Sequence, residues 1–190
     1  MAIVTKTSVK AYLDISGSSL DSFITDAISK IEADIKAFCG QEIEETTVDY
    51  VMRGNGKSLM LLKNDPVTTI NNLYYRDKPT DVWTEETDST KFSLTIPDGI
   101  YSIYYNDGFT QSREYKVNYT YGYSTVPEDV KKVAIEMTSD YLLNSYATDL
   151  SEAQRHGIRQ KATGFSGDTQ TTTYELSNYA RQLGKYVSVV

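Results

Sequence analysis

One segment of the chain resembles a phosphate-binding loop, in which backbone N–H groups of a glycine-rich turn cradle phosphate oxygens. Residues 54–58 read Gly-Asn-Gly-Lys-Ser and so contain the Gly-Lys-Ser triplet of that loop. The complete motif also requires a glycine five positions before the glycine of the triplet, and the chain has Val51 there. Strand-like residues flank the segment on both sides, so Asn55-Gly56 is predicted to form a hairpin turn instead.

A second segment resembles the nucleophile elbow of serine hydrolases. Gly164-Phe165-Ser166-Gly167 has a serine between glycines, but the second glycine comes one residue early and no strand-to-helix pattern surrounds it. His156 is the only histidine in the chain, so a catalytic triad would need it as the base for Ser166. A small hydrolase built on this pair is one alternative function.

Paired acids and aromatic residues point to another alternative, the binding of carbohydrates. Glu44-Glu45 and Glu85-Glu86 offer the two carboxylates that glycoside hydrolysis uses, although adjacent acids in polar segments are usually solvated. Trp83 and Tyr74-Tyr75 could form a stacking platform for sugars, or serve equally well in the core of a sheet. A carbohydrate- or surface-binding module therefore requires these three aromatic side chains to be exposed in one concave patch.

Residues suited to contact a macromolecular partner are concentrated near the C-terminus. Four residues between 155 and 161 form the only local basic cluster, which could contact phosphates or an acidic neighbouring subunit, or be a solvated helix end. The chain has sixteen tyrosines against five phenylalanines, and tyrosine is common both at interfaces and on half-buried strands. The candidate contact residues are Arg155, His156, Arg159, Lys161, Tyr174, Tyr179 and Tyr186.

The composition argues against several other classes of protein. Cys39 is the only cysteine, so no internal disulfide can form, and with one histidine the chain has no cluster for a zinc site. We therefore expect no metal or cofactor, and we expect Cys39 to be buried near a helix end. No stretch approaches the ~18 apolar residues of a membrane span, so no membrane partner is expected. A net charge of -7 without a basic stripe is unsuited to tight DNA binding.

The N-terminal 40 residues predict two helices. The first is short, beginning at a Thr7 or Ser8 cap and stopping at Gly17, whereas the second begins at Ser18 or Ser19 and ends at Gly40, which supplies a left-handed stop. Apolar residues recur in the second helix at intervals of three and four, which places them on one face. These apolar positions are Leu20, Phe23, Ile24, Ala27, Ile28, Ile31, Ile35 and Phe38.

The middle of the chain, residues 46–125, predicts a small antiparallel sheet, sandwich or barrel. Turn residues recur about every ten positions, and the runs between them are rich in Val, Ile, Thr and Tyr. The predicted strands are 48–52, 58–62, 68–76, 92–96, 100–105 and 115–121.

Helical spacing returns over residues 127–146, where Pro127 stands at the first helical position and two acids follow at the positive end of the helix dipole. Its apolar face is a natural partner for the second helix. The predicted fold is therefore α+β, a helical bundle formed by N- and C-terminal helices with an inserted small antiparallel β domain. The predicted limits are 1–45 and 127–160 for the bundle, 46–126 for the β insertion, and 161–190 for an extended or mobile tail with a short terminal helix.

Three pieces of the chain occur in a particular order and spacing over about residues 1–146. They are Val4-Thr5 to Ile15 with the long helix that ends in Cys39-Gly40; Leu59-Met60-Leu61-Leu62 with Asp65-Pro66-Val67-Thr68-Thr69-Ile70; and Val117-Asn118-Tyr119-Thr120-Tyr121-Gly122-Tyr123 with Val126-Pro127-Glu128-Asp129-Val130-Lys131-Lys132. Together they resemble the head-tail connector, or adaptor, proteins of tailed bacteriophages, in particular the longer members with a β-rich insertion.

This resemblance implies a structural virion protein that is not an enzyme and is made in the cytoplasm of the bacterial host. Such a subunit docks beneath the portal protein in a homo-oligomeric ring, usually a dodecamer, joins head to tail, and offers a platform for a tail or stopper protein. The ring extends the channel for DNA, which passes without specific binding. The alternative within a phage is a carbohydrate- or surface-binding β module of the tail or baseplate.

Overall fold

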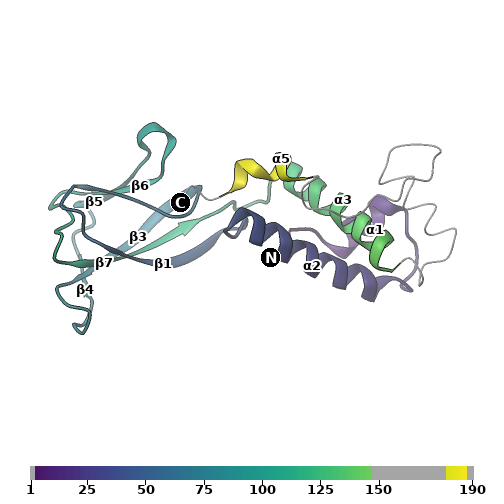
Figure 1. Ribbon diagram of the computed structural model, residues 1–190, viewed down its shortest axis with the longest axis horizontal. Helices are drawn as coiled ribbons and strands as arrows, with labels where there is room; N and C mark the ends of the chain where they lie inside the picture. The colour runs from purple at the N-terminus through teal and green to yellow at the C-terminus, as the bar shows by residue number, and fades with distance from the viewer. Residues whose placement is uncertain (1–2, 147–178, 188–190) are drawn as a thin grey trace. The chain divides into compact units, whose positions relative to one another are not determined.

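The computed structural model describes residues 3–146 and 179–187, which belong to two compact units (Figure 1). Unit 1 joins the two ends of the chain, from Met1–Gly40 and Val126–Val187, and its described residues form helices. Unit 2 comprises Gln41–Thr125 and is built from strands. The predicted α+β class is therefore confirmed.

Unit 1 contains α1 (Lys6–Leu13), α2 (Asp21–Cys39), α3 (Glu128–Ser145), the short α5 (Ala180–Leu183) and a following 3-10 turn, η3 (Gly184–Tyr186). Of these, α2 and α3 pack against each other, and each also contacts α1 and α5, so this helix pair forms the centre of the unit. None of the helices in the described part of the chain is long and apolar enough to cross a membrane.

The helices bury the faces that the sequence pattern predicts, with one addition on α3. The buried residues of α2 are Ile24, Ala27, Ile28, Ile31, Ile35 and Cys39. On α3 the buried surface also includes three polar residues, Thr138, Ser139 and Asp140. The hydroxyls of Thr138 and Ser139 donate hydrogen bonds to backbone carbonyls four residues earlier, at 2.6 and 2.8 Å, so these two side chains are satisfied within the helix.

Unit 2 contains two antiparallel sheets with strand orders β1-β7-β3-β4 and β2-β6-β5. The strands are β1 (Thr46–Arg53), β2 (Leu59–Leu61), β3 (Val67–Arg76), β4 (Thr84–Glu85), β5 (Phe92–Thr95), β6 (Ser102–Tyr105) and β7 (Glu114–Tyr121). A 3-10 turn, η1 (Pro97–Gly99), connects β5 to β6. The two-residue β4 was not predicted, because it is too short to show an alternating pattern.

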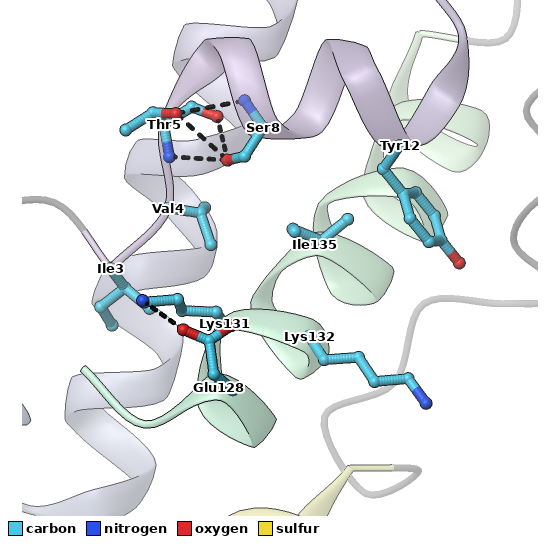
Figure 2. A pocket seen from close by; sticks show the side chains of 9 residues that line it. All are labelled: Ile3, Val4, Thr5, Ser8, Tyr12, Glu128, Lys131, Lys132 and Ile135. Carbon is cyan, nitrogen blue, oxygen red and sulfur yellow. Dashed lines mark hydrogen bonds and ion pairs between the residues drawn. The ribbon is translucent and has the colours of Figure 1, made fainter. Parts of the chain in front are cut away.

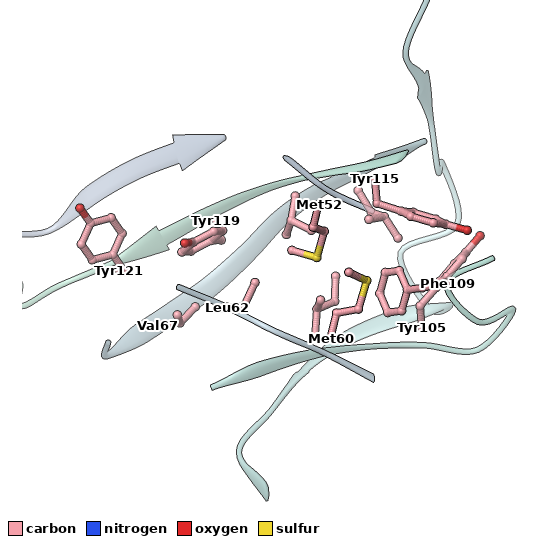
Figure 3. Packing of buried hydrophobic residues seen from close by; sticks show 12 residues of the cluster. Met52, Met60, Leu62, Val67, Tyr105, Phe109, Tyr115, Tyr119 and Tyr121 are labelled. Carbon is pink, nitrogen blue, oxygen red and sulfur yellow. The ribbon is translucent and has the colours of Figure 1, made fainter. Parts of the chain in front are cut away.

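The core of unit 2 lies between the two sheets (Figure 3). β7 alternates strictly, burying Tyr115, Val117, Tyr119 and Tyr121 and turning the residues between them outward. Phe109 is fully buried beside Tyr115, with ring centroids 4.9 Å apart. Many of the tyrosines therefore serve the sheet core, which was one of the two predicted explanations for their abundance.

The hairpin predicted at Asn55-Gly56 is wrong. β1 pairs with β7 and β2 pairs with β6, so residues 54–58 cross from one sheet to the other. The Asn55 side chain accepts a hydrogen bond from the Lys57 N–H and donates one to the Leu59 carbonyl, so the turn is closed locally. Phe109 bonds both sides of the loop through its backbone, accepting from Gly56 and donating to Lys57. These long-range backbone hydrogen bonds, rather than a local hairpin, determine where the chain goes after β1.

Candidate functional site

The C-terminal segment of unit 1 is held on α3 by two tyrosine–aspartate hydrogen bonds. The hydroxyl of Tyr179 donates to Asp140 Oδ2 at 2.6 Å, and that of Tyr186 donates to Asp129 Oδ1 at 2.7 Å. Asp129 also forms an ion pair with Lys185. Because Leu183 is fully buried between these points, the whole segment 179–187 is part of the folded unit.

The two hydrogen bonds lie in different electrostatic environments. Tyr179 and Asp140 are 9% and 6% exposed, and burial raises the pKa of Asp140 although the tyrosine hydrogen bond partly opposes this. Burial and the hydrogen bond to Asp140 also raise the pKa of Tyr179. The contact between Tyr186 and Asp129 is more exposed to solvent, and there the hydrogen bonds from Lys185 and Tyr186 lower the pKa of Asp129.

Only two of the seven candidate contact residues lie in the described part of the chain. Tyr179 and Tyr186 are both buried and make contacts within their own subunit. The other five fall outside the described residues, and they are Arg155, His156, Arg159, Lys161 and Tyr174.

The two aspartates that hold these tyrosines were missed by the sequence analysis. The sequence shows only that Asp129 and Asp140 are three helical turns apart and so lie on one face of α3, which does not by itself point to Tyr179 and Tyr186 as their partners.

A groove with a volume of about 470 Å³ lies between α1 and α3 (Figure 2). It is lined by Ile3, Val4, Thr5, Ser8, Tyr12, Glu128, Lys131, Lys132 and Ile135. At its N-terminal end Thr5 caps α1 through reciprocal hydrogen bonds with Ser8. Although five of the nine lining residues are polar or charged, most of the surface that they turn to the groove is apolar, and Lys131 pairs with Glu128 at 2.7 Å, so the groove suits an apolar side chain more than a charged ligand.

The three aromatic residues considered for sugar stacking do not form one patch. Tyr74 and Tyr75 are neighbours on β3 and point to opposite faces of the sheet, and Tyr75 packs against the buried core. Trp83 lies on the outer face with Tyr74, where the Lys116 ammonium stacks on both rings, 4.4 Å from the Tyr74 centroid and 5.4 Å from that of Trp83. The platform that the carbohydrate-binding alternative requires is therefore absent from these residues.

Of the two acid pairs considered for glycoside hydrolysis, Glu85-Glu86 is engaged in structural contacts. Asn72 donates to Glu85 at 2.6 Å, and the hydroxyl of Tyr105 donates to Glu86 at 2.9 Å. Within the described residues no group of three His, Cys, Asp or Glu side chains could hold a metal ion. Ser166 and His156 lie outside the described residues.

Cys39 is expected to be unreactive in the folded protein. It is fully buried at the C-terminal end of α2, as predicted, and burial raises the pKa of its thiol to about 11. Since the thiolate is the reactive form, a maleimide at pH 7 should label wild-type protein only after denaturation in urea. Mass spectrometry counts the label, and labelling of the native chain at the rate of a free thiol would contradict this expectation.

These features define a class of protein before any comparison: a helical unit made from both chain ends, an inserted antiparallel β unit, and surfaces suited to packing. The head completion protein family matches residues 2–177, and the chain belongs to this family. The resemblance to head-tail connector proteins stated from the sequence is thereby confirmed. A search of the curated proteins found no match.

Two solved structures contain chains with a similar fold. A chain from the neck of an empty gene transfer agent particle, computed with C6 symmetry, is 12% identical with a TM-score of 0.54, over 90% of this chain and 80% of that one. A chain from the virion of a native gene transfer agent particle is 13% identical with a TM-score of 0.57, over 91% and 94%. At these identities the comparison establishes a common fold.

Proposed function

We propose that the chain is a non-enzymatic virion subunit that forms a ring beneath the portal protein, joins the phage head to its tail and extends the DNA channel. The match to the head completion protein family over residues 2–177 carries this proposal. The fold shared with a chain from the neck of a gene transfer agent particle supports it, because a neck lies where such an adaptor would work.

In this proposal the ring is a dodecamer that contacts the portal protein on one side and a tail or stopper protein on the other. The subunit is made in the cytoplasm of the host and acts in the virion. DNA passes through without specific binding, since a chain with a net charge of -7 repels the phosphate backbone more than it attracts it. The basic cluster at Arg155, His156, Arg159 and Lys161, with Tyr174, remains a proposed contact with the portal, with DNA or between subunits.

Native mass spectrometry of the purified chain, alone and mixed with the portal protein of the same phage, tests the proposal. We expect a ring of defined copy number in at least one of the two samples, with twelve copies when the portal is present. A chain that remains monomeric in both samples and binds glycans instead would contradict the adaptor function. That result would favour the surface-binding module.

A further inference from the structure

Unit 2 exposes apolar side chains in two separate places. Among the described residues, six of the seven large apolar side chains with high exposure belong to this unit, and they are Val51, Leu61, Val82, Ile96, Ile100 and Tyr104. Contiguous exposed apolar surface is uncommon in monomeric proteins and marks sites of interaction.

The first place is the connection between β5 and β6, which we call the hairpin tip (residues 96–100). Ile96 and Ile100 are 50% and 37% exposed and flank Asp98. The Asp98 side chain makes no hydrogen bond or ion pair with any residue that the structure describes. Leu61 and Tyr104 extend this surface on the outward side of the same sheet. The hairpin tip is thus an apolar projection with one unpaired negative charge.

The second place is on the outer face of the four-stranded sheet, and we call it the aromatic patch (Val51, Tyr74, Val82 and Trp83, around Lys116). Val51, Lys116 and Tyr74 are cross-strand neighbours on β1, β7 and β3. Lys116 lies against the rings of Tyr74 and Trp83 with only 21% of its side chain exposed. Lys116 also forms an ion pair with Asp49 Oδ2 at 3.7 Å, which is too long for a hydrogen bond, and the Arg76 guanidinium lies 4.2 Å from the centroid of the Trp83 ring.

The rest of the same outer face is a polar surface exposed to solvent. There the side chains are polar and hydrogen-bonded to one another across the strands. Thr47 and Thr120 are 2.9 Å apart, and Asn118 donates to Asp49 at 2.7 Å and accepts from Asn71 at 2.9 Å. The apolar exposure at the hairpin tip and the aromatic patch is therefore local rather than a general property of unit 2.

We propose that the hairpin tip of one subunit docks on the aromatic patch of a second copy of this chain. Ile96 and Ile100 pack against the aromatic rings, and Asp98 accepts a hydrogen bond from Lys116. The chemistry is complementary, since Asp98 has no partner among the described residues and Lys116 makes only a 3.7 Å ion pair, without a hydrogen bond, to Asp49. Trp and Tyr are the residue types that most often dominate binding energy at interfaces.

The arrangement of the two surfaces suits a ring. In Figure 1 the β5–β6 connection projects from one side of unit 2, and β4, which follows Trp83, lies toward the other side. A contact between two different surfaces of one subunit is heterologous, and repeated copies close into a ring when the rotation allows it. The inference rests on the proposed ring function and specifies which residues of neighbouring subunits meet.

Cross-linking between variants tests the contact directly. Ile100→Cys and Val82→Cys chains of different mass are mixed at high concentration and treated with a short bis-maleimide, with the buried Cys39 left in place. We expect a cross-linked product containing one chain of each kind, and little product from either variant alone. Thr47→Cys, exposed on the polar part of the same sheet face, is the matched control and should not cross-link to Ile100→Cys.

A second measurement tests the charge pair. Asp98→Asn should weaken association in sedimentation velocity roughly tenfold, because it removes a hydrogen bond to a charged group. Asp14→Asn is the matched control, since both aspartates are exposed and have positive φ, 52° and 56°, where asparagine is well tolerated. Asp14 lies in unit 1, so this control should associate like wild type.

The outcomes separate this inference from the proposed function. If wild type forms a ring by native mass spectrometry but Ile100→Cys and Val82→Cys do not cross-link, the inferred contact is wrong and the ring function stands. If Ile100→Cys cross-links only to itself or to the portal protein, the contact is likewise wrong. If wild type forms no ring with or without portal protein, the proposed function fails and the cross-link is not expected either.

Discussion

Replacing Gly54 with alanine is expected to destabilise unit 2 by about 3 kcal/mol. A Cβ atom at this position would lie 2.0 Å from the carbonyl oxygen of Thr110 and 2.7 Å from that of Phe109. These are backbone atoms, and they are held in place because Phe109 is fully buried and the Thr110 N–H donates to the Tyr115 hydroxyl at 2.9 Å. The clash therefore has no flexible side chain to relieve it.

Urea denaturation followed by tryptophan fluorescence measures this effect, since Trp83 is the only tryptophan and lies in unit 2. Gly99→Ala is the matched control in the same unit. Its Cβ would meet nothing within 4 Å, so it carries only the strain of its positive φ, roughly 1–2 kcal/mol. Equal midpoints for Gly54→Ala and wild type would show that the loop at residues 54–58 is not packed as described.

Removing the hydroxyl of Tyr179 is expected to weaken the docking of residues 179–187 by about 2 kcal/mol. Tyr179→Phe leaves the buried Asp140 without the 2.6 Å hydrogen bond that it accepts in the wild type. Tyr186→Phe is the control of the same chemistry and should cost less, because Asp129 is 46% exposed on its side chain and keeps its ion pair with Lys185. Hydrogen exchange of residues 180–186 and urea denaturation followed by circular dichroism measure the two effects.

Acidification should change the contributions of Asp140 and Asp129 to the folding stability in opposite directions. The pKa of Asp140 is raised in the folded state, so its contribution to stability is fully present below the unfolded pKa of about 3.9 and is lost as pH rises through the folded pKa. The pKa of Asp129 is lowered, so its contribution is present above the unfolded pKa and is lost as pH falls through the folded pKa.

Comparison of stability against pH for two variants separates these contributions. Asp140→Asn should lose stability more steeply than wild type between neutral pH and about pH 4, because the stabilising protonation of Asp140 is gone. Asp129→Asn should lose less than wild type on acidification. If both variants follow the wild-type curve, the pKa shifts of these aspartates do not contribute to the stability of unit 1.

Periodicity identified the helices and most strands, because burial of one face imposes a repeat on the sequence. The second helix was expected from Ser18 or Ser19 to Gly40, and α2 spans Asp21–Cys39 with Gly40 as its left-handed cap. β7 was expected over residues 115–121 and spans Glu114–Tyr121. These elements are long enough to repeat their pattern several times.

Features that depend on contacts between segments distant in the sequence could not be predicted from the hydrophobic periodicity. Asn55-Gly56 has the sequence of a hairpin turn, yet Phe109 draws the loop across to the other sheet. Asp140 looks like an exposed helix residue, yet Tyr179, 39 positions later, makes its burial tolerable. The opposite facing of Tyr74 and Tyr75 follows from strand alternation, but only the pairing with β7 decides which ring joins the core.

The sequence by itself determined the family, the α+β class and the failure of the phosphate-loop motif at Val51, because these depend on the order, spacing and identity of residues along the chain. Only the tertiary structure decided that Tyr179 and Tyr186 are anchors within their own subunit, and that Asp98, without a partner among the described residues, and Lys116, with a 3.7 Å ion pair to Asp49, lie on separate surfaces of unit 2. Whether a side chain is buried, paired or exposed depends on which distant segments meet it, and a linear pattern does not carry that information.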